Sequence, residues 1–258
     1  MYSPKQAAQR LADGGVGKAQ LPARKAFVLG ILAGACIALG GFAAAAASAG
    51  TPVQKLINAC LFPAGLIMTV LMGAELFTGN CMMVLPLLQR RISLGAMLRN
   101  WVLVYLGNLA GAVAVAAMAC FSGLAAAGTV SGDALTATAA AKCTLAFGPA
   151  FLRGIGCNVL VCAAVVMAAG ADSAGSKAAC LFFPVMAFVA AGFEHSVANM
   201  FYIPAGLFAA GGTQAALTWG RFFLGNLVPV TLGNLVGGGL LGVILWFAHL
   251  RSPRGAEK

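Results

Sequence analysis

The sequence predicts an all-α integral membrane protein with six transmembrane helices, arranged as an inverted repeat of three plus three helices. Three observations predict this class. Of the 258 residues, 61% are hydrophobic and only 9% are charged, whereas an ordinary soluble domain is about 25% charged. Six apolar segments are long enough to cross a bilayer. The two halves of the chain also carry matching motifs.

A transmembrane helix needs about 20 apolar residues, which sets the length of each predicted span. The predicted spans are 26–48, 57–88, 98–124, 149–171, 178–210 and 224–250. Before the first span, Ser3 and Pro4 predict the start of a short surface helix, and Gly14-Gly15 predicts its end. The first 25 residues contain five basic residues and no apolar core, so no cleavable signal peptide is expected.

The distribution of Lys and Arg predicts the orientation in the membrane. With six spans and a cytoplasmic start, 12 of the 16 basic residues lie inside and only four lie outside. The four are Lys55, Lys142, Arg153 and Arg221. This bias is the one that the positive-inside rule expects. We therefore expect a multi-pass protein of the inner (cytoplasmic) membrane with both termini in the cytoplasm. Five or seven spans would destroy the bias.

The corresponding organisation has five parts along the chain. They are a cytoplasmic N-terminal segment (1–25), a first three-helix repeat (26–124), an extracellular connection (125–148), a second, inverted repeat (149–250) and a cytoplasmic tail (251–258).

The repeat is visible in all three pairs of spans. The second and fifth spans both read Phe-Pro and then Gly-x-Glu-x-x-x-small-Asn, at 62–80 and 183–199. Asn100 precedes Gly-Asn-Leu-Ala-Gly at 107–111 with the spacing by which Asn226 precedes Gly-Asn-Leu-Val-Gly at 233–237. The first and fourth spans share Phe-x-x-Gly-Ile, at 27–31 and 151–155. Because three is odd, the second copy enters the bilayer from the opposite side, as in many transporters and channels.

The second and fifth spans are also too long for a single crossing and contain polar clusters. We therefore expect two broken helices, with short non-helical loops around Thr78 to Cys81 and Ser196 to Asn199. Unwound backbone cannot face lipid, because every unpaired amide costs several kcal/mol, so it must line a cavity or be buried in protein. The two loops are expected to meet at the midpoint of a pore.

The composition excludes several other classes of function. Six acidic residues and two histidines leave few groups for catalysis, so we expect no enzyme. The basic residues lie between apolar segments, and this distribution argues against nucleic-acid binding. The eight cysteines have no CxxC motif and no His at metal spacing, so buried thiols are expected rather than a disulfide framework or a metal site. No cofactor is expected.

At these motifs the chain resembles the formate/nitrite transporter family, which includes formate, nitrite and hydrosulfide channels. The resemblance is carried by Gly-Ala-Glu-Leu-Phe-Thr-Gly-Asn (73–80), Gly-Phe-Glu-His-Ser-Val-Ala-Asn-Met-Phe (192–201) and Asn-Leu-Val-Pro-Val-Thr-Leu-Gly-Asn (226–234), and it extends from the first span to the last. It implies an aquaporin-like protomer in a homopentamer, with one pore in each subunit for a small monovalent anion or its acid.

The resemblance also implies roles for particular residues. The central site contains Thr78 and His195, with Asn199 at the same break. The implied outer constriction is formed by Phe62, Leu66 and Phe188. The implied inner constriction is formed by Leu76 and Val161, beside Asn158. Lys142 is the implied lysine of the outer vestibule. The cargo remains open between formate, nitrite, hydrosulfide and a longer monocarboxylate.

Glu75, Glu194 and His195 are the ionisable residues deepest in the apolar spans. Such groups cost several kcal/mol and usually mark a pathway or a buried pair. His195 lies at a symmetry-related break, which favours a functional histidine over a structural one. Glu75 and Glu194 are expected to bind loop amides and to hold the breaks in place, with direct contact to substrate as the alternative.

An isolated anion would pay tens of kcal/mol to enter an apolar constriction, by idealised Born estimates, whereas a neutral acid pays much less. We therefore expect Lys142 to attract the anion, and the anion to be protonated before or at His195, so that proton and anion move together. Lys142 as an ordinary exposed loop lysine is the alternative.

Two other classes of protein share some of these features. An aquaporin-like channel for neutral solutes would share the inverted repeat, but the paired Asn-Pro-Ala motifs of such channels are absent. In an intramembrane enzyme, His195 and Ser196 would have to act together, yet neighbouring residues on a helix point about 100° apart.

Overall fold

The computed structural model describes residues 1–251, and the tail from 252 to 258, with Arg254, Glu257 and Lys258 of the predicted cytoplasmic tail, lies outside the described residues. Its α-helices are α1 (Pro4–Ala19), α2 (Ala23–Ser48), α3 (Gln54–Leu61), α4 (Pro63–Leu71), α5 (Phe77–Asn80), α6 (Val84–Leu88), α7 (Leu94–Phe121), α8 (Val130–Cys143), α9 (Phe147–Gly170), α10 (Ala174–Ala191), α11 (Ser196–Ala210) and α12 (Val228–Leu245). A 3₁₀ segment, η1 (Cys81–Met83), and two π-helical segments, η2 (Arg221–Leu227) and η3 (Trp246–Leu250), complete them.

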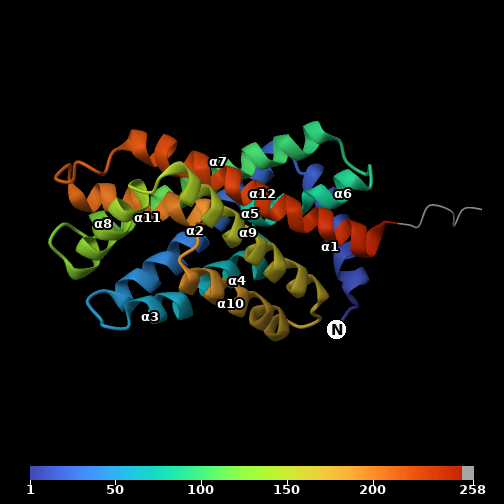
Figure 1. Ribbon diagram of the computed structural model, residues 1–258, viewed down its shortest axis with the longest axis horizontal. Helices are drawn as coiled ribbons and strands as arrows, with labels where there is room; N and C mark the ends of the chain where they lie inside the picture. Colours follow the sequence, from blue (N-terminus) through green and yellow to red (C-terminus); the bar gives the residue numbers. More distant parts are fainter. Residues whose placement is uncertain (252–258) are drawn as a thin grey trace, which may run out of the picture.

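Within residues 1–251, six helices are long and apolar enough to cross a membrane, which confirms the predicted class. They correspond to α2, α3 with α4, α7, α9, α10, and η2 with α12 and η3. Two shorter apolar helices, at 77–88 and 196–210, are the second halves of the broken spans. The long helices lie lengthwise in the molecule, with α8 at one end and α1 at the opposite end (Figure 1). We call these the α8 end and the α1 end.

One closely packed pair of helices occurs in each repeat. Helix α2 packs on α7, and α9 packs on α12. A Cβ atom added at Gly111 would lie 2.1 Å from the carbonyl oxygen of Ile31, and one added at Gly237 would lie 2.3 Å from that of Ile155. Only glycine allows the two backbones to approach so closely. The small residues of the repeat therefore pack helices within one protomer.

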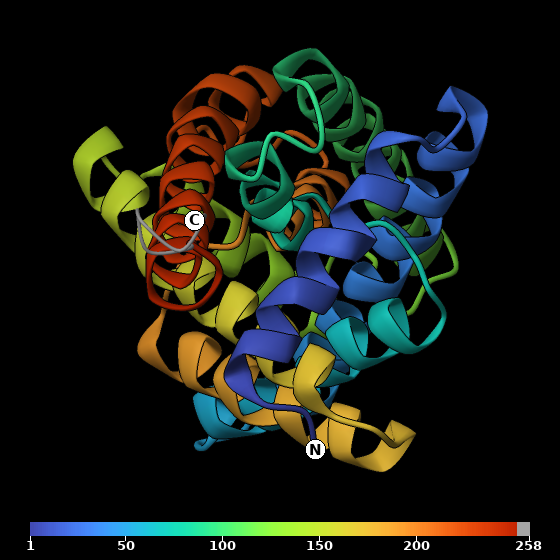
Figure 2. The ribbon, with the colours of Figure 1, turned by 90° about the vertical axis from the view of Figure 1, so that its right-hand side faces the viewer.

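Helix α1 lies obliquely across the α1 end of the molecule (Figure 2). Ser3 caps it as predicted, since its side chain accepts a hydrogen bond from the backbone of Gln6. The predicted stop at Gly14-Gly15 is wrong, because the helix continues to Ala19. Gly15 instead allows contact with the neighbouring segment: a Cβ atom there would lie 2.8 Å from the ring of Pro86.

Two ion pairs fasten α1 outside the membrane spans. The amino group of Met1 binds Asp172, at the start of the loop after α9, and Arg91 binds Asp13. Hydrogen bonds from Arg91 and Gln9 lower the pKa of the Asp13 carboxyl. Both pairs are solvent-exposed, and such pairs contribute little stability individually. They fix the direction of α1 more than they stabilise the fold.

Both broken spans end their first half at a glycine with a positive φ angle. These are Gly73 (φ 67°) and Gly192 (φ 78°), a conformation that residues with a side chain rarely adopt. Leu76 and His195 are then extended, with φ −109° in each, and the second halves begin directly after them.

The broken helices are thus confirmed, but the predicted positions of the loops are wrong. Thr78 to Asn80 belong to α5, and Ser196 to Asn199 form the first turn of α11. The non-helical residues precede these segments in both repeats. Thr, Ser and Asn were interpreted as loop residues because they are polar, whereas here they begin a helix, where such residues are also favoured.

Candidate functional site

One asparagine in each repeat holds the broken helix in place. The side-chain oxygen of Asn108 accepts a hydrogen bond from the backbone N–H of Phe77 (2.9 Å). Its nitrogen donates to the carbonyl oxygens of Gly30 (2.8 Å) and Glu75 (2.9 Å). Two backbone groups at the break, the Phe77 N–H and the Glu75 carbonyl, are thereby paired where water and lipid cannot satisfy them, and the bond to Gly30 ties them to α2.

Asn234 repeats this arrangement in the second half. It accepts from the N–H of Ser196 (2.9 Å) and donates to the carbonyl oxygens of Gly154 (2.8 Å) and Glu194 (3.0 Å). The sequence motif that predicted the repeat therefore encodes the same set of hydrogen bonds twice.

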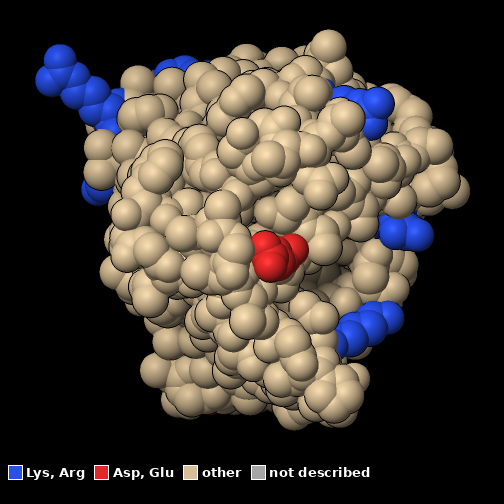
Figure 3. All heavy atoms as spheres, turned by 90° about the vertical axis from the view of Figure 1, so that its left-hand side faces the viewer, with Lys and Arg blue, Asp and Glu red and all other residues tan. Residues whose placement is uncertain are grey.

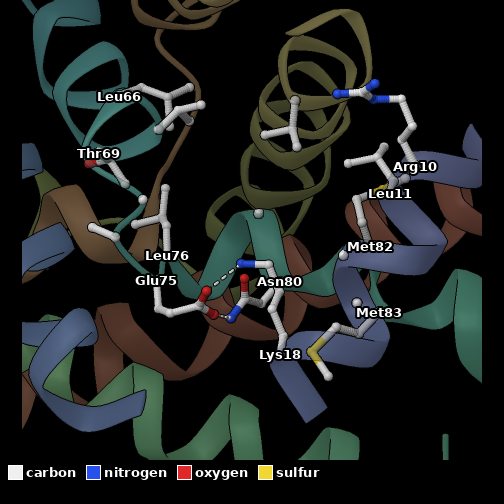
Figure 4. Close-up of a pocket in the computed structure, with 17 residues that line it drawn as sticks. Arg10, Leu11, Lys18, Leu66, Thr69, Glu75, Leu76, Asn80, Met82 and Met83 are labelled. Atoms are coloured by element: carbon white, nitrogen blue, oxygen red, sulfur yellow. Dashed lines mark hydrogen bonds and ion pairs between the residues drawn. The ribbon is translucent and has the colours of Figure 1, made fainter. Parts of the chain in front are cut away.

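A second geometry that occurs in both repeats surrounds the buried glutamates. We call the two sets of residues the inner quartet and the outer quartet. The inner quartet contains Lys18, Glu75, Asn80 and Asn100. The Lys18 ammonium lies 2.7 Å from Glu75 Oε1, and Asn80 Nδ2 donates to Glu75 Oε2 (2.7 Å) and to Asn100 Oδ1 (2.8 Å). Asn100 Nδ2 then donates to the Lys18 carbonyl. Figure 4 shows Glu75 and Asn80 facing one another, with Lys18 nearby.

The outer quartet contains Lys142, Glu194, Asn199 and Asn226. Lys142 Nζ lies 3.0 Å from both oxygens of Glu194, and Asn199 Nδ2 donates to Glu194 Oε2 and to Asn226 Oδ1, at 2.7 Å each. Asn226 Nδ2 donates to the Lys142 carbonyl (3.0 Å). Helix α8 therefore supplies the lysine at its end of the molecule as α1 does at the other, so the segment between the two repeats contains the counterpart of α1.

The two quartets correct the expected role of the glutamates. Glu75 and Glu194 do bind groups near the breaks, but those groups are lysine and asparagine side chains rather than loop amides. A buried carboxylate is costly unless it is paired and hydrogen-bonded. Each glutamate has both kinds of partner.

His195 and Thr78 meet between the two breaks. The imidazole Nε2 lies 2.9 Å from Thr78 Oγ1, and the two residues are 117 apart in sequence. Nδ1 accepts a hydrogen bond from the backbone N–H of Ala198 (3.0 Å), so His195 also caps helix α11. With Nδ1 as an acceptor, a neutral ring carries its hydrogen on Nε2 and donates it to Thr78. The Thr78 hydroxyl hydrogen then remains available for another acceptor.

A cavity opens toward this pair from each end. The cavity at the α8 end has a volume of about 160 Å³, and its lining includes Lys142, Asn199, His195 and the rings of Phe62 and Phe188. Figure 3 shows this end of the molecule, where basic side chains lie near the edge and acidic atoms lie nearer the middle. We call it the outer cavity.

The inner cavity, at the α1 end, has a volume of about 260 Å³ (Figure 4). Lys18, Glu75 and Asn80 contribute polar groups to it, and Leu66 and Leu76 contribute apolar ones. Each cavity therefore contains the glutamate and lysine of one quartet.

A layer of buried apolar side chains lies where the cavities approach each other. Phe62 and Phe188 are in edge-to-face contact (5.8 Å between ring centroids), and Phe188 stacks on the His195 ring (5.9 Å). Leu66, Leu76 and Val161 are also buried, with exposed fractions of 4% or less. Leu66 lines the inner cavity, whereas Phe62 and Phe188, with which it was grouped, line the outer one.

The remaining candidate residues lie close to this centre. Asn158 is fully buried and donates to the Asn234 carbonyl (2.6 Å). Lys142 is not an ordinary exposed lysine, because its side chain is only 16% exposed and is paired with Glu194. Sequence reasoning missed the roles of Lys18 and Asn100. The repeat contained a usable signal, since Asn100 and Asn226 had already been matched.

The cysteines offer no alternative centre. All eight are free thiols, and six of them are buried. Residues 1–251 contain no group of three or more His, Cys, Asp or Glu side chains that could hold a metal ion.

The inverted repeat, the two broken helices and the two facing cavities define a membrane channel or transporter. The family model for the formate/nitrite transporter matches residues 5–248. The chain belongs to this family.

Relatives and solved structures agree with this assignment. A probable formate transporter of Methanothermobacter thermautotrophicus is 44% identical over 91% of this chain and 92% of its own length. A solved ion channel of the same family superposes with a TM-score of 0.88 at 30% identity, covering 96% of this chain and 99% of the other. A pentameric formate channel with formate bound gives a TM-score of 0.76 at 34% identity, covering 89% and 98%.

Proposed function

We propose that this protein is a channel for small monovalent weak-acid anions of the formate, nitrite and hydrosulfide class, which cross the apolar layer as the neutral acid together with a proton. The observation that carries the proposal is the contact between His195 and Thr78. It joins the two broken helices between two cavities that open to opposite ends. The side chains around it are apolar, so an uncharged species meets the lower barrier.

The arrangement supports a sequence of steps for uptake. The anion enters the outer cavity near Lys142, and it is protonated there or at the central pair. The Thr78 hydroxyl and the His195 ring offer hydrogen bonds midway, and the acid then passes Leu76 and Val161 into the inner cavity. Lys18 attracts the anion in the same way when flow is reversed.

The orientation and assembly form part of the same proposal. The α1 end carries most of the basic residues, and this bias supports the proposal that it faces the cytoplasm, in the inner (cytoplasmic) membrane. The similarity to a pentameric formate channel supports a homopentamer with one pore in each subunit.

Purified protein in proteoliposomes provides the direct test. Formate, nitrite and hydrosulfide uptake should rise as the external pH falls. One proton should enter with each anion, and the internal pH should therefore drop during uptake. Osmotic water permeability should stay at the level of empty liposomes. Rapid water or glycerol flux without uptake of weak acids would favour the neutral-solute channel instead.

Lys142 should matter for uptake at low substrate concentration. Replacing Lys142 with Met removes the cation from the outer cavity and leaves the Glu194 carboxylate without its ion pair. The loss of about 1.4 kcal/mol of attraction corresponds to an approximately tenfold fall in formate uptake. Lys55→Met is the matched control, because Lys55 lines the same cavity but is exposed and has no ion pair within residues 1–251. Equal uptake by the Lys142 variant and the wild type would exclude an attracting role.

A further inference from the structure

The side-chain amide of Asn199 has a nitrogen with two hydrogen bonds and an oxygen with none among the described residues. Both hydrogens of Nδ2 are used, one by Glu194 and one by Asn226. The amide orientation is fixed as well, because Asn226 must use its own nitrogen to reach the Lys142 carbonyl and can therefore offer only an oxygen to Asn199. Within the described part of the chain, Asn199 Oδ1 is buried and has no hydrogen-bond partner. Such an atom costs about 1–3 kcal/mol unless something donates to it.

The position of this oxygen indicates what could donate to it. Asn199 lines the outer cavity, on the approach to Phe62 and Phe188. An anion such as formate carries only acceptors and would be repelled by a lone pair. A neutral weak acid carries an O–H or S–H donor and matches it. Lys142 has three hydrogens and two bonds to Glu194, so one hydrogen remains for the other oxygen of the acid.

Asn80 occupies the equivalent position in the inner cavity. Asn80 lines it, and both hydrogens of its Nδ2 are used, by Glu75 and Asn100. No hydrogen bond between described residues uses Asn80 Oδ1. Each cavity is therefore lined by an asparagine whose side-chain oxygen has no hydrogen-bond partner among the described residues and whose nitrogen is held by the quartet of its own repeat.

We propose that Asn199 Oδ1 and Asn80 Oδ1 are docking sites for the protonated substrate, one in each cavity, which accept the acidic hydrogen of the neutral weak acid. This inference rests on the proposed function, and it specifies the form of the substrate that each mouth binds. Asn199 and Asn80 select molecules that carry a donor over strong-acid anions such as nitrate, which carry none.

Loss of such a site has a distinctive kinetic signature. A docking site before the apolar layer stabilises the bound acid but does not lower the barrier measured from free acid in solution. Its loss therefore raises the half-saturation concentration. The permeability at low substrate concentration stays the same, because it depends only on the barrier measured from free acid. The effect is also confined to the side that the cavity faces.

The experiment measures ¹⁴C-formate flux at fixed pH in right-side-out and inverted membrane vesicles, with concentrations expressed as formic acid. Asn199→Leu should raise the half-saturation concentration about fivefold for entry from the external side, as expected for one lost neutral hydrogen bond. Entry from the cytoplasmic side should keep its half-saturation concentration. Asn80→Leu should show the opposite sidedness, and it tests the proposal independently if the Asn199 variant does not fold.

Asn226→Leu is the matched structural control. It breaks the same quartet, but the Glu194 carboxylate still accepts from Asn199 Nδ2 and keeps the amide orientation, so permeability should fall without a change in half-saturation concentration. Three results would overturn the docking sites: an equal rise of the half-saturation concentration in the Asn226 and Asn199 variants, a rise for entry from both sides, or no rise at all. In the last case the oxygen binds only water. If the wild type itself shows no weak-acid flux, the proposed function fails instead.

Discussion

Replacing His195 with phenylalanine should abolish most of the coupled flux of formate and protons. The ring keeps its stacking on Phe188, but the donor to Thr78 and the acceptor for the Ala198 N–H are both lost. Two buried polar groups are left unpaired at about 1–3 kcal/mol each, so we expect a decrease of about 100-fold. Formate uptake and the accompanying internal acidification in liposomes measure it.

His195→Asn separates the two roles of the imidazole. Asparagine is a favoured N-cap and can accept from Ala198, but it does not place a donor where Nε2 lies. This variant should fold as the wild type does and still lose most of the flux. His249→Asn is the control, because His249 lies near the end of the last span, in η3. Undiminished coupled transport in His195→Phe would exclude the central role of the ring.

Replacing Asn234 with leucine should have the largest effect on stability. Asn234 pairs the Ser196 N–H and the Glu194 carbonyl at the second break, and it also donates to the Gly154 carbonyl of α9. Leucine leaves the two break groups without that partner, at about 1–3 kcal/mol each, and removes the bond that ties the break to α9. We expect a loss of at least about 3 kcal/mol, which is a large part of the stability of a typical domain. The melting temperature in detergent measures it.

Two comparisons sharpen this result. Asn108→Leu should be destabilising to a similar extent, because it removes the equivalent bonds in the first repeat. Asn58→Leu makes the same chemical change where only one long hydrogen bond, from Tyr202 (3.4 Å), is lost. It should cost about 1 kcal/mol or less. Equal melting temperatures for the Asn234 and Asn58 variants would show that the break does not depend on Asn234.

Much of the site was visible in the sequence because the repeat marked it twice. Glu75 with Glu194, and Asn80 with Asn199, were matched by motif, and each pair occupies equivalent positions in the two quartets. Lys18 was not recognised, because it lies 57 residues from Glu75 and outside every predicted span. The contact exists because α1 folds back over the inner cavity, and no local pattern encodes that direction.

The membrane class, the number of spans and the inverted repeat could all be predicted from the chain alone, because hydrophobic length and motif spacing are properties of consecutive residues. The positions of the helix breaks and the groups that line each cavity depend on contacts between distant segments. The breaks are set by Gly73 and Gly192 together with Asn108 and Asn234, which act from another helix. His195 likewise meets Thr78 only after both halves have folded, since that hydrogen bond joins residues 117 positions apart.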